Sequence, residues 1–343
     1  MAHFRTRFTP ILLSLGALAA AGCGGGGAES ARTAKTSDVI TIDGSSTVMP
    51  ITEAMAEDFM KANPGTRVTV GESGTTGGFG KFCRNESDIN DASRPIKESE
   101  VTECAKLQIS VVELPVAYDG LTVVVNPKNT WAASMTLAEL KKLWSPEAQN
   151  KINRWSQIRA GWPDREIHLF GPGTASGTFE YFNEAVNGNA KASRGDYTAS
   201  EDDNALVQGV AGDELALGYF GLAYYEVNKA RLKAVALDDE KPENGAGPIV
   251  PGFDTVRNAS YPLSRPLFIY ANSARLSSRP ELQQFVDFYL KAPVDTVRRV
   301  GYVPLTDAER QLVQQRFGAK KTGSMYGSGA PAGTLEDRLK GGR

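Results

Sequence analysis

The sequence predicts an α/β fold in which strands end in turns that hold a ligand. The first observation is the stretch 171–182, where a turn rich in glycine and hydroxyl side chains separates an apolar run from aromatic residues at helical spacing. The second observation is that two further turns of the same composition occur at 43–50 and 71–79. The third observation is the β-branched run 121–125, which is typical of a strand covered on both faces.

The three turns share a chemistry that suits an anion. The turn within 171–182 carries Thr174, Ser176 and Thr178 where the first backbone N–H groups of a helix have no partner within the helix. Those groups and the positive end of the helix dipole attract anions. A lone serine or threonine at a helix start is more often only an N-cap. Three such turns, each after a candidate strand, favour one shared anion site at the carboxyl edge of the sheet.

The other elements follow in chain order. The apolar runs predict strands at 39–42, 67–70, 88–96, 109–114, 121–127, 167–170, 215–222, 233–237 and, as a long crossing strand, 262–270. Apolar residues at helical spacing predict helices at 51–59, 98–107, 137–144, 179–186, 205–210 and 281–290. Residues 297–303 close the core. The stretch 319–343 has no apolar period and predicts a disordered tail.

The first residues predict export. Two arginines precede an apolar run at 11–21 that is too short to span a bilayer, so residues 1–22 read as a secretory signal. Small residues lead up to Cys23, which resembles the lipoprotein pattern in which that cysteine is acylated; the alternative is an ordinary signal before a mature chain that happens to carry a cysteine. Residues 23–37 then form a flexible tether. We expect a periplasmic or cell-surface protein anchored to the membrane by lipid.

Composition excludes two classes of partner. The formal net charge is −2 and the lysines and arginines are dispersed, so no nucleic-acid surface is indicated. No stretch beyond 11–21 is long and apolar enough to cross a membrane. Without residues 1–22 the chain keeps about 320 residues, enough for two domains.

The cysteine count points to one disulfide. Of the three cysteines, Cys83 and Cys104 remain if Cys23 carries lipid. In an exported protein two such thiols are expected to pair. A metal or redox site is the weaker alternative, because the spacing is not C-x-x-C and no histidine lies near.

Five segments in the same order and at similar spacing resemble the extracytoplasmic phosphate-binding proteins of ABC uptake systems. They are 43–47, 74–78, 118–123, 140–155 and 176–178. The resemblance covers roughly residues 38–318 and is strongest to the cyanobacterial-type subgroup, which also carries the two cysteines and the loop 92–95.

This resemblance implies a type II periplasmic binding protein with two lobes, a ligand cleft between them and a hinge of crossing strands. It implies that 38–119 with 221–318 form lobe I and that 120–220 form lobe II. It further implies a monomer that binds inorganic phosphate, without a cofactor or metal, and passes it to an ABC permease of the inner membrane. Another tetrahedral oxyanion, such as sulfate, molybdate or phosphonate, is the alternative ligand.

The resemblance also assigns binding residues. The matching hydroxyl and glycine positions are Ser46, Thr47, Thr75, the adjacent Thr76, Ser176, Gly177 and Thr178. Two positions depart from better-known members: Pro172 stands where they have an arginine, and Arg94 stands near the place of an aspartate. Arg94 either offers its guanidinium to the anion, replacing the missing charge, or only forms an ion pair.

Phosphate near neutral pH keeps a proton and donates a hydrogen bond, whereas sulfate does not. A carboxylate acceptor in the cleft therefore selects phosphate. The candidates, which the sequence does not rank, are Asp91, Asp88, Asp43 and Asp202.

Catalysis is disfavoured by the same residues. Only two histidines exist, His3 in the signal and His168, so a serine triad would depend on His168 alone. The sequence 71–75 misses a nucleophile elbow because Thr75 replaces its last glycine, and 171–178 lacks the P-loop lysine. A secreted hydrolase is therefore the least favoured hypothesis, and we expect no enzyme.

Overall fold

The computed structural model describes residues 39–174, 176–200, 202–241, 247–327 and 333–341. The predicted signal 1–22, the tether 23–37 and Cys23 lie outside these ranges. Within them, no helix has the length and apolar character needed to cross a membrane.

Strands and helices alternate along most of the chain, as the sequence predicts. The strands are β1 (Val39–Gly44), β2 (Arg67–Val70), β3 (Ile89–Ala92), β4 (Val111–Val125), β5 (Ser134–Thr136), β6 (His168–Gly171), β7 (Thr198–Ala199), β8 (Ala216–Gly221), β9 (Lys233–Ala234), β10 (Ala236–Asp238), β11 (Ser264–Asn272) and β12 (Val303–Pro304). The helices are α1 (Met49–Ala62), α2 (Gly74–Cys83), α3 (Glu98–Lys106), α4 (Leu137–Trp144), the 3-10 turn η2 (Pro146–Ala148), α5 (Trp155–Ile158), α6 (Gly177–Asn187), α7 (Asp203–Gly212), α8 (Leu222–Asn228), α9 (Phe253–Arg257), α10 (Ser273–Ser278), α11 (Pro280–Lys291), α12 (Val294–Arg299), α13 (Asp307–Gly318) and α14 (Leu335–Gly341).

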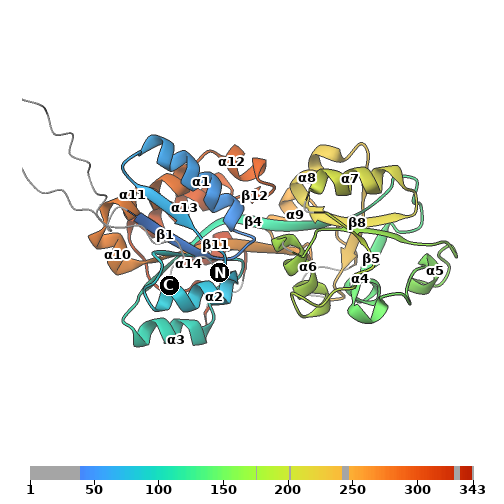
Figure 1. Cartoon of the computed structure of the whole chain (residues 1–343), viewed down its shortest axis with the longest axis horizontal. Helices are drawn as coiled ribbons and strands as arrows, with labels where there is room; N and C mark the ends of the chain where they lie inside the picture. The colour runs from blue at the N-terminus through green and yellow to red at the C-terminus, as the bar shows by residue number, and fades with distance from the viewer. Residues whose placement is uncertain (1–38, 175, 201, 242–246, 328–332, 342–343) are drawn as a thin grey trace, which may run out of the picture. The chain divides into compact units, whose positions relative to one another are not determined.

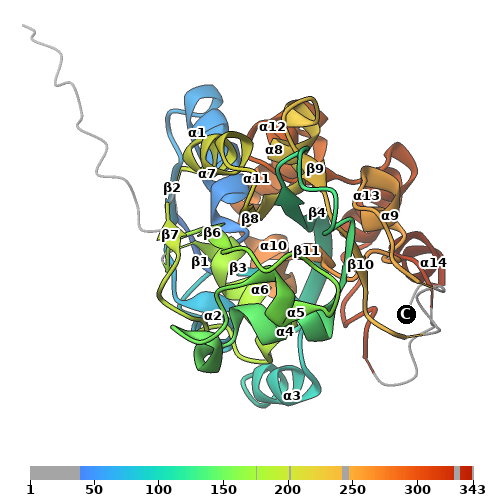
Figure 2. The same ribbon diagram turned by 90° about the vertical axis from the view of Figure 1, so that its right-hand side faces the viewer.

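One strand, β4, joins two groups of strands. The sheet runs β2-β1-β3-β11-β4-β8-β6-β7, with β9 and β12 also paired to β4, and β10 pairs with β5 separately. β1, β2 and β3 are mutually parallel, as are β6, β7 and β8, whereas β11 is antiparallel to β3 and β4. Figure 1 shows β4 and β11 passing from the group of β1 toward the group of β8. Figure 2 views the same elements from the side of α4, α5 and α6.

The sequence forms β4 because most of its residues are apolar, and all of it is buried, including the carboxylates of Glu113 and Asp119. The expected runs 109–114 and 121–127 are therefore parts of one strand that continues through Pro115. Pro115 has no N–H to donate, and the pairing with β11 shifts register between Leu267 and Phe268, directly opposite it.

The segment after β8 pairs with strands that precede it. β9 pairs with β4 beside β8, and β10 pairs with β5. The next strand to pair with β3 is β11. Apolar side chains hold this segment, because Leu232 is buried in one cluster with Val124 and Phe220. The division of the chain at 221 stays a prediction.

The segment 319–343 was expected to be disordered, but its described residues, 319–327 and 333–341, pack against the rest of the protein. The backbone N–H of Gly323 donates to the carbonyl of Val111 in β4, and the buried Glu113 carboxylate accepts from Ser324 Oγ and the N–H of Met325. α14 follows and buries Leu335. A buried acceptor on β4 thus fixes a segment whose composition alone indicates no packing.

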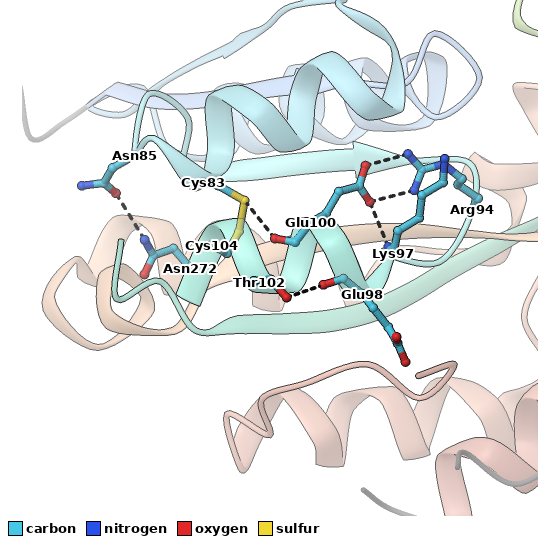
Figure 3. The surroundings of a disulfide bond; sticks show 9 residues. All are labelled: Cys83, Asn85, Arg94, Lys97, Glu98, Glu100, Thr102, Cys104 and Asn272. Carbon is cyan, nitrogen blue, oxygen red and sulfur yellow. Dashed lines mark hydrogen bonds and ion pairs between the residues drawn. A yellow bond between two sulfur atoms is a disulfide. The ribbon is translucent and has the colours of Figure 1, made fainter. Parts of the chain in front are cut away.

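The predicted disulfide is confirmed. Cys83, the last residue of α2, is bonded to Cys104 in α3 with an S–S length of 1.97 Å (Figure 3). The bond therefore ties the helix that begins at the second predicted turn to the helix behind the Arg94 loop.

Candidate functional site

A pocket of ≈ 210 Å³ lies where the first two predicted turns meet α6 and β11. Most of its lining is polar. The residues that line it are Thr47, Ser73, Gly74, Thr75, Thr76, Gly77, Ser93, Arg94, Glu180, Tyr181, Glu184, Ala190 and Arg265.

The first turn contacts the third. Thr47 Oγ1 donates to the carbonyl of Gly177 at 3.4 Å, and Ser46 Oγ donates to Glu180 Oε2 at 3.4 Å. A Cβ on Gly177 would lie 2.6 Å from Thr47 Oγ1, so only glycine permits this approach. Two of the three predicted turns, far apart in the chain, therefore meet.

The second turn forms one wall of the pocket through α2. Thr75 Oγ1 accepts from the backbone N–H of Ser93 at 3.1 Å and shares a hydrogen bond with Ser93 Oγ at 3.1 Å. Thr76 Oγ1 accepts from Arg94 Nη2 at 2.8 Å. Both predicted threonines thus line the pocket, and both are held by the loop that follows β3.

Arg94 lines the pocket but is already paired. Its Nη1 and Nη2 donate to Glu100 Oε2 and Oε1 at 2.9 and 2.7 Å, and the pair is visible in Figure 3. Arg94 and Glu100 are 22% and 13% exposed, so water screens the pair only partly. The structure thus contains the ion pair that was one of the two alternatives for Arg94, and a contact with ligand stays a prediction.

The third turn begins α6 with a cap. Ser176 is the N-cap residue, and its Oγ accepts from the backbone N–H of Thr178 at 3.1 Å. Ser176, Gly177 and Thr178 are not among the described residues that line the pocket, whereas Glu180 and Tyr181 one turn later are. The third turn therefore reaches the pocket through its helix and through the contact with the first turn.

Two of the proposed proton acceptors hold local structure. Asp43 accepts from Ser73 Oγ and forms an ion pair with Lys81 Nζ at 2.6 Å. Asp202 caps α7 by accepting from the N–H of Asn204 at 2.9 Å. Neither is among the described lining residues, although Asp43 orients Ser73, which is.

The other two aspartates are buried away from the pocket lining. Asp88 is paired with Arg275 and, at 2.7 Å, with Arg279. Asp91 is fully buried, its Oδ1 accepts from Thr52 Oγ1 at 3.0 Å, and burial raises its pKa to about 8 despite that hydrogen bond. None of the four aspartates is among the described residues that line this pocket.

Arg265 is the main residue that the sequence analysis missed. It projects from β11 into the pocket lining, and its Nη2 donates to Thr47 Oγ1 at 3.1 Å. Its guanidinium carbon lies 3.6 Å from the centre of the Tyr181 ring. Its Nη2 pairs at 3.3 Å with Asp119, whose pKa is raised by burial. An arginine within the otherwise apolar run 262–270 was the available signal.

Glu180 and Glu184 of α6 were also missed. They are the acidic residues among the described lining, and they follow Ser176 by four and eight residues, so they continue along one face of the helix. The pocket lining thus contains hydroxyl and guanidinium donors as well as carboxylate acceptors. Such a set binds an anion that also carries a proton to donate.

The described residues offer neither a metal centre nor a triad at this pocket. No group of three or more His, Cys, Asp or Glu among them is arranged to hold a metal ion. His168 is half-exposed, its Nδ1 is paired with Asp213, and it does not line the pocket.

Comparison with known proteins places the chain in a family. Residues 28–293 match the PBP superfamily domain. Protein SphX of Synechocystis sp. is 49% identical over 294 residues, covering 85% of this chain and 86% of that protein. Phosphate-binding protein PstS of Staphylococcus saprophyticus is 36% identical and covers 82% and 85%. The crystal structure of a possible phosphate binding protein from Planctomyces limnophilus, 49% identical, matches with a TM-score of 0.78 over 82% of this chain and 98% of that one.

Proposed function

The chain belongs to the PBP superfamily, and from that membership we propose that it binds inorganic phosphate outside the cytoplasm and delivers it to an ABC importer. The observation that carries the proposal is the meeting of Thr47, Thr75, Arg265 and Glu180 around one polar pocket. The names of the similar proteins support the same ligand. The protein acts by binding, and no bond of the ligand is broken.

The three turns supply most of the donors. The proposed contacts are those expected from the sequence, namely Ser46, Thr47, Thr75, Thr76, Ser176, Gly177 and Thr178, with Arg94 at the rim. Their hydroxyls bond other groups of the protein, for example Thr47 Oγ1 with the carbonyl of Gly177 and Thr75 Oγ1 with Ser93 Oγ. A bound oxyanion replaces such contacts by stronger ones, because hydrogen bonds to a charged acceptor are shorter and stronger than neutral ones.

The proton acceptor in this proposal is Glu180. It lines the pocket, and among the residues that the structure describes its Oε2 accepts only from Ser46 Oγ, at 3.4 Å, so it remains available to a ligand O–H. The four aspartates are engaged elsewhere. With sulfate the Glu180 carboxylate would face a bare oxygen of like charge, which penalises sulfate.

Calorimetry on the unaltered protein tests the ligand. We expect phosphate to bind and sulfate to bind at least about a hundredfold more weakly, in line with a buried group left unpaired by the wrong ligand. Glu180→Gln should narrow that ratio, and Glu103→Gln on the surface of α3 should not. If sulfate, molybdate or a phosphonate binds more tightly than phosphate, that anion is the ligand and the proposal of phosphate is wrong. Turnover of a phosphate ester that is lost in Ser176→Ala would overturn a binding-only role.

Anchoring and delivery are proposed from the sequence. Cys23 carries the lipid, the tether 23–37 spans the distance to the membrane surface, and a monomer presents the bound anion to the permease. Radiolabelled palmitate should enter the protein in cells and should be absent from Cys23→Ser. Label retained in that variant would reject the anchor.

A further inference from the structure

Arg265 occupies a position that links the two groups of strands. In the register of β11 against β4 it lies directly opposite Asp119. The two side chains are 13% and 3% exposed, so this is a cross-strand ion pair with little access to water. Both strands are the long ones that pass between the groups of β1 and β8 (Figure 1).

The guanidinium of Arg265 contacts three elements at once. It donates to Thr47 Oγ1 of the first turn, pairs with Asp119 of β4 and stacks on Tyr181 of α6. Its hydrogen bonds to the described residues come from Nε and Nη2, and Nη1 has no acceptor among those residues. One donor pair of the fork is thus left for a ligand in the pocket that Arg265 lines.

Charge balance distinguishes Arg265 from Arg94. Arg94 is bound by both oxygens of Glu100 at 2.7 and 2.9 Å, which saturates its fork. Arg265 shares a single oxygen of Asp119 at 3.3 Å through both Nε and Nη2, a longer and weaker contact. Of these two pocket-lining arginines, Arg265 is therefore the one whose positive charge is less strongly paired and more available to an incoming anion.

We propose that Arg265 is the main cationic contact of the bound oxyanion, with Arg94 at the rim, and this inference rests on the proposed function. The third turn carries Pro172 and no cation of its own, so the positive charge comes from a crossing strand. Asp119 sets the direction of the fork, and the Tyr181 ring holds its plane, so little rotamer freedom is lost on binding. The Nη1 group donates to the anion while Nη2 keeps Thr47 beside it.

The test compares four variants with the unaltered protein by calorimetry with inorganic phosphate. Arg265→Gln should weaken binding by about 10- to 100-fold, the value of a charge-assisted hydrogen bond. The double variant Asp119→Asn with Arg265→Gln should lose as much, although it strands no buried charge. Arg265→Lys should recover part of the loss, since charge returns without the planar fork.

Arg159→Gln is the matched control. Arg159 also pairs with a carboxylate, Glu139 at 2.6 Å, and lies 4.6 Å from the Trp162 ring, but it does not line the pocket. It should bind phosphate like the unaltered protein.

The outcomes separate the inference from the function. Phosphate binding by the unaltered protein with equal affinity in Arg265→Gln overturns the role of Arg265 and leaves the function intact. A loss in Arg265→Gln that the double variant regains also overturns it, because a stranded Asp119 charge would then explain the loss. Absence of phosphate binding by the unaltered protein overturns the function and the inference together.

Discussion

The buried carboxyl of Asp91 predicts a protein that becomes less stable as the pH rises from about 4 to 8. Its pKa is raised from 3.8 to about 8, first by burial and also by the nearby Asp43 carboxylate. The facing groups are the hydroxyls of Thr52 and Tyr289, which are hydrogen-bonded to each other, and neither supplies a positive charge. The folded state therefore keeps a proton that the unfolded chain loses near pH 4.

The sign and size follow from linkage. Where the folded state binds one more proton than the unfolded state, the free energy of unfolding falls by about 1.4 kcal/mol per pH unit. The stability that comes from the protonated Asp91 carboxyl is fully present below the pKa of this group in the unfolded chain. It is lost as the pH rises to the pKa of the group in the folded protein. Between pH 5 and pH 7 the loss is roughly 3 kcal/mol, and over the whole window roughly 6 kcal/mol.

Asp91→Asn removes the titration and keeps the shape. The amide oxygen accepts from Thr52 as Oδ1 does now, and the amide is neutral at every pH. Urea unfolding should show the variant more stable than the unaltered protein at both pH 5 and pH 8, with a difference that grows by about 4 kcal/mol between the two pH values. Parallel pH slopes in the two proteins would refute the reasoning. Asp88→Asn is the contrasting variant, since it breaks ion pairs with Arg275 and Arg279 and should lower stability at both pH values.

Three further predictions concern the site and its supports. Arg94→Ala should weaken phosphate binding severalfold because it removes a pocket-lining cation, whereas Arg165→Ala, outside that lining, should not; equal calorimetric affinities would reject a role for Arg94. Reduction followed by alkylation should label Cys83 and Cys104 in intact-mass spectra, with no labelling before reduction, and should lower the free energy of unfolding by about 3 kcal/mol; unchanged stability would contradict that estimate. Glu113→Ala should lower the free energy of unfolding in urea by about 2–4 kcal/mol, because Ser324 Oγ and the N–H of Met325 lose their acceptor. Deletion of the segment after α13 should lower stability less in this variant than in the unaltered protein. Additive losses of stability would show that the carboxylate does not hold the tail.

The turns were predictable because their information is local. Glycine and hydroxyl residues between an apolar run and a helical period mark a strand-to-helix turn wherever the rest of the chain lies. Thr47, Thr75 and Thr76 were therefore found from the sequence, and the structure brings all three to one pocket. The N-cap role of Ser176 was also foreseeable, because an N-cap serine and an anion-binding serine both lie at the first residue of a helix.

The charged members of the pocket were not predictable, because their placement depends on long-range register. Arg265 reaches the pocket only because β11 pairs with β4 so that it faces Asp119. Glu180 lies one helical turn beyond the motif. A carboxylate at that position of a helix is as common on an exposed surface as in a binding site, so the sequence does not single it out. In the structure Asp43 holds Ser73 of the second turn and Asp202 caps α7, whereas Asp88 and Asp91 are buried.

Moving the cation from a turn to a crossing strand has a mechanical consequence. Arg265 is bonded to the first turn and to β4 and, through its ring contact, lies against α6. An anion bound at Nη1 therefore acts on the same guanidinium that pairs with Asp119 through Nε and Nη2. Since Asp119 and Arg265 are register partners on the two strands that join both groups, the ligand then acts directly on the segment about which the groups would move.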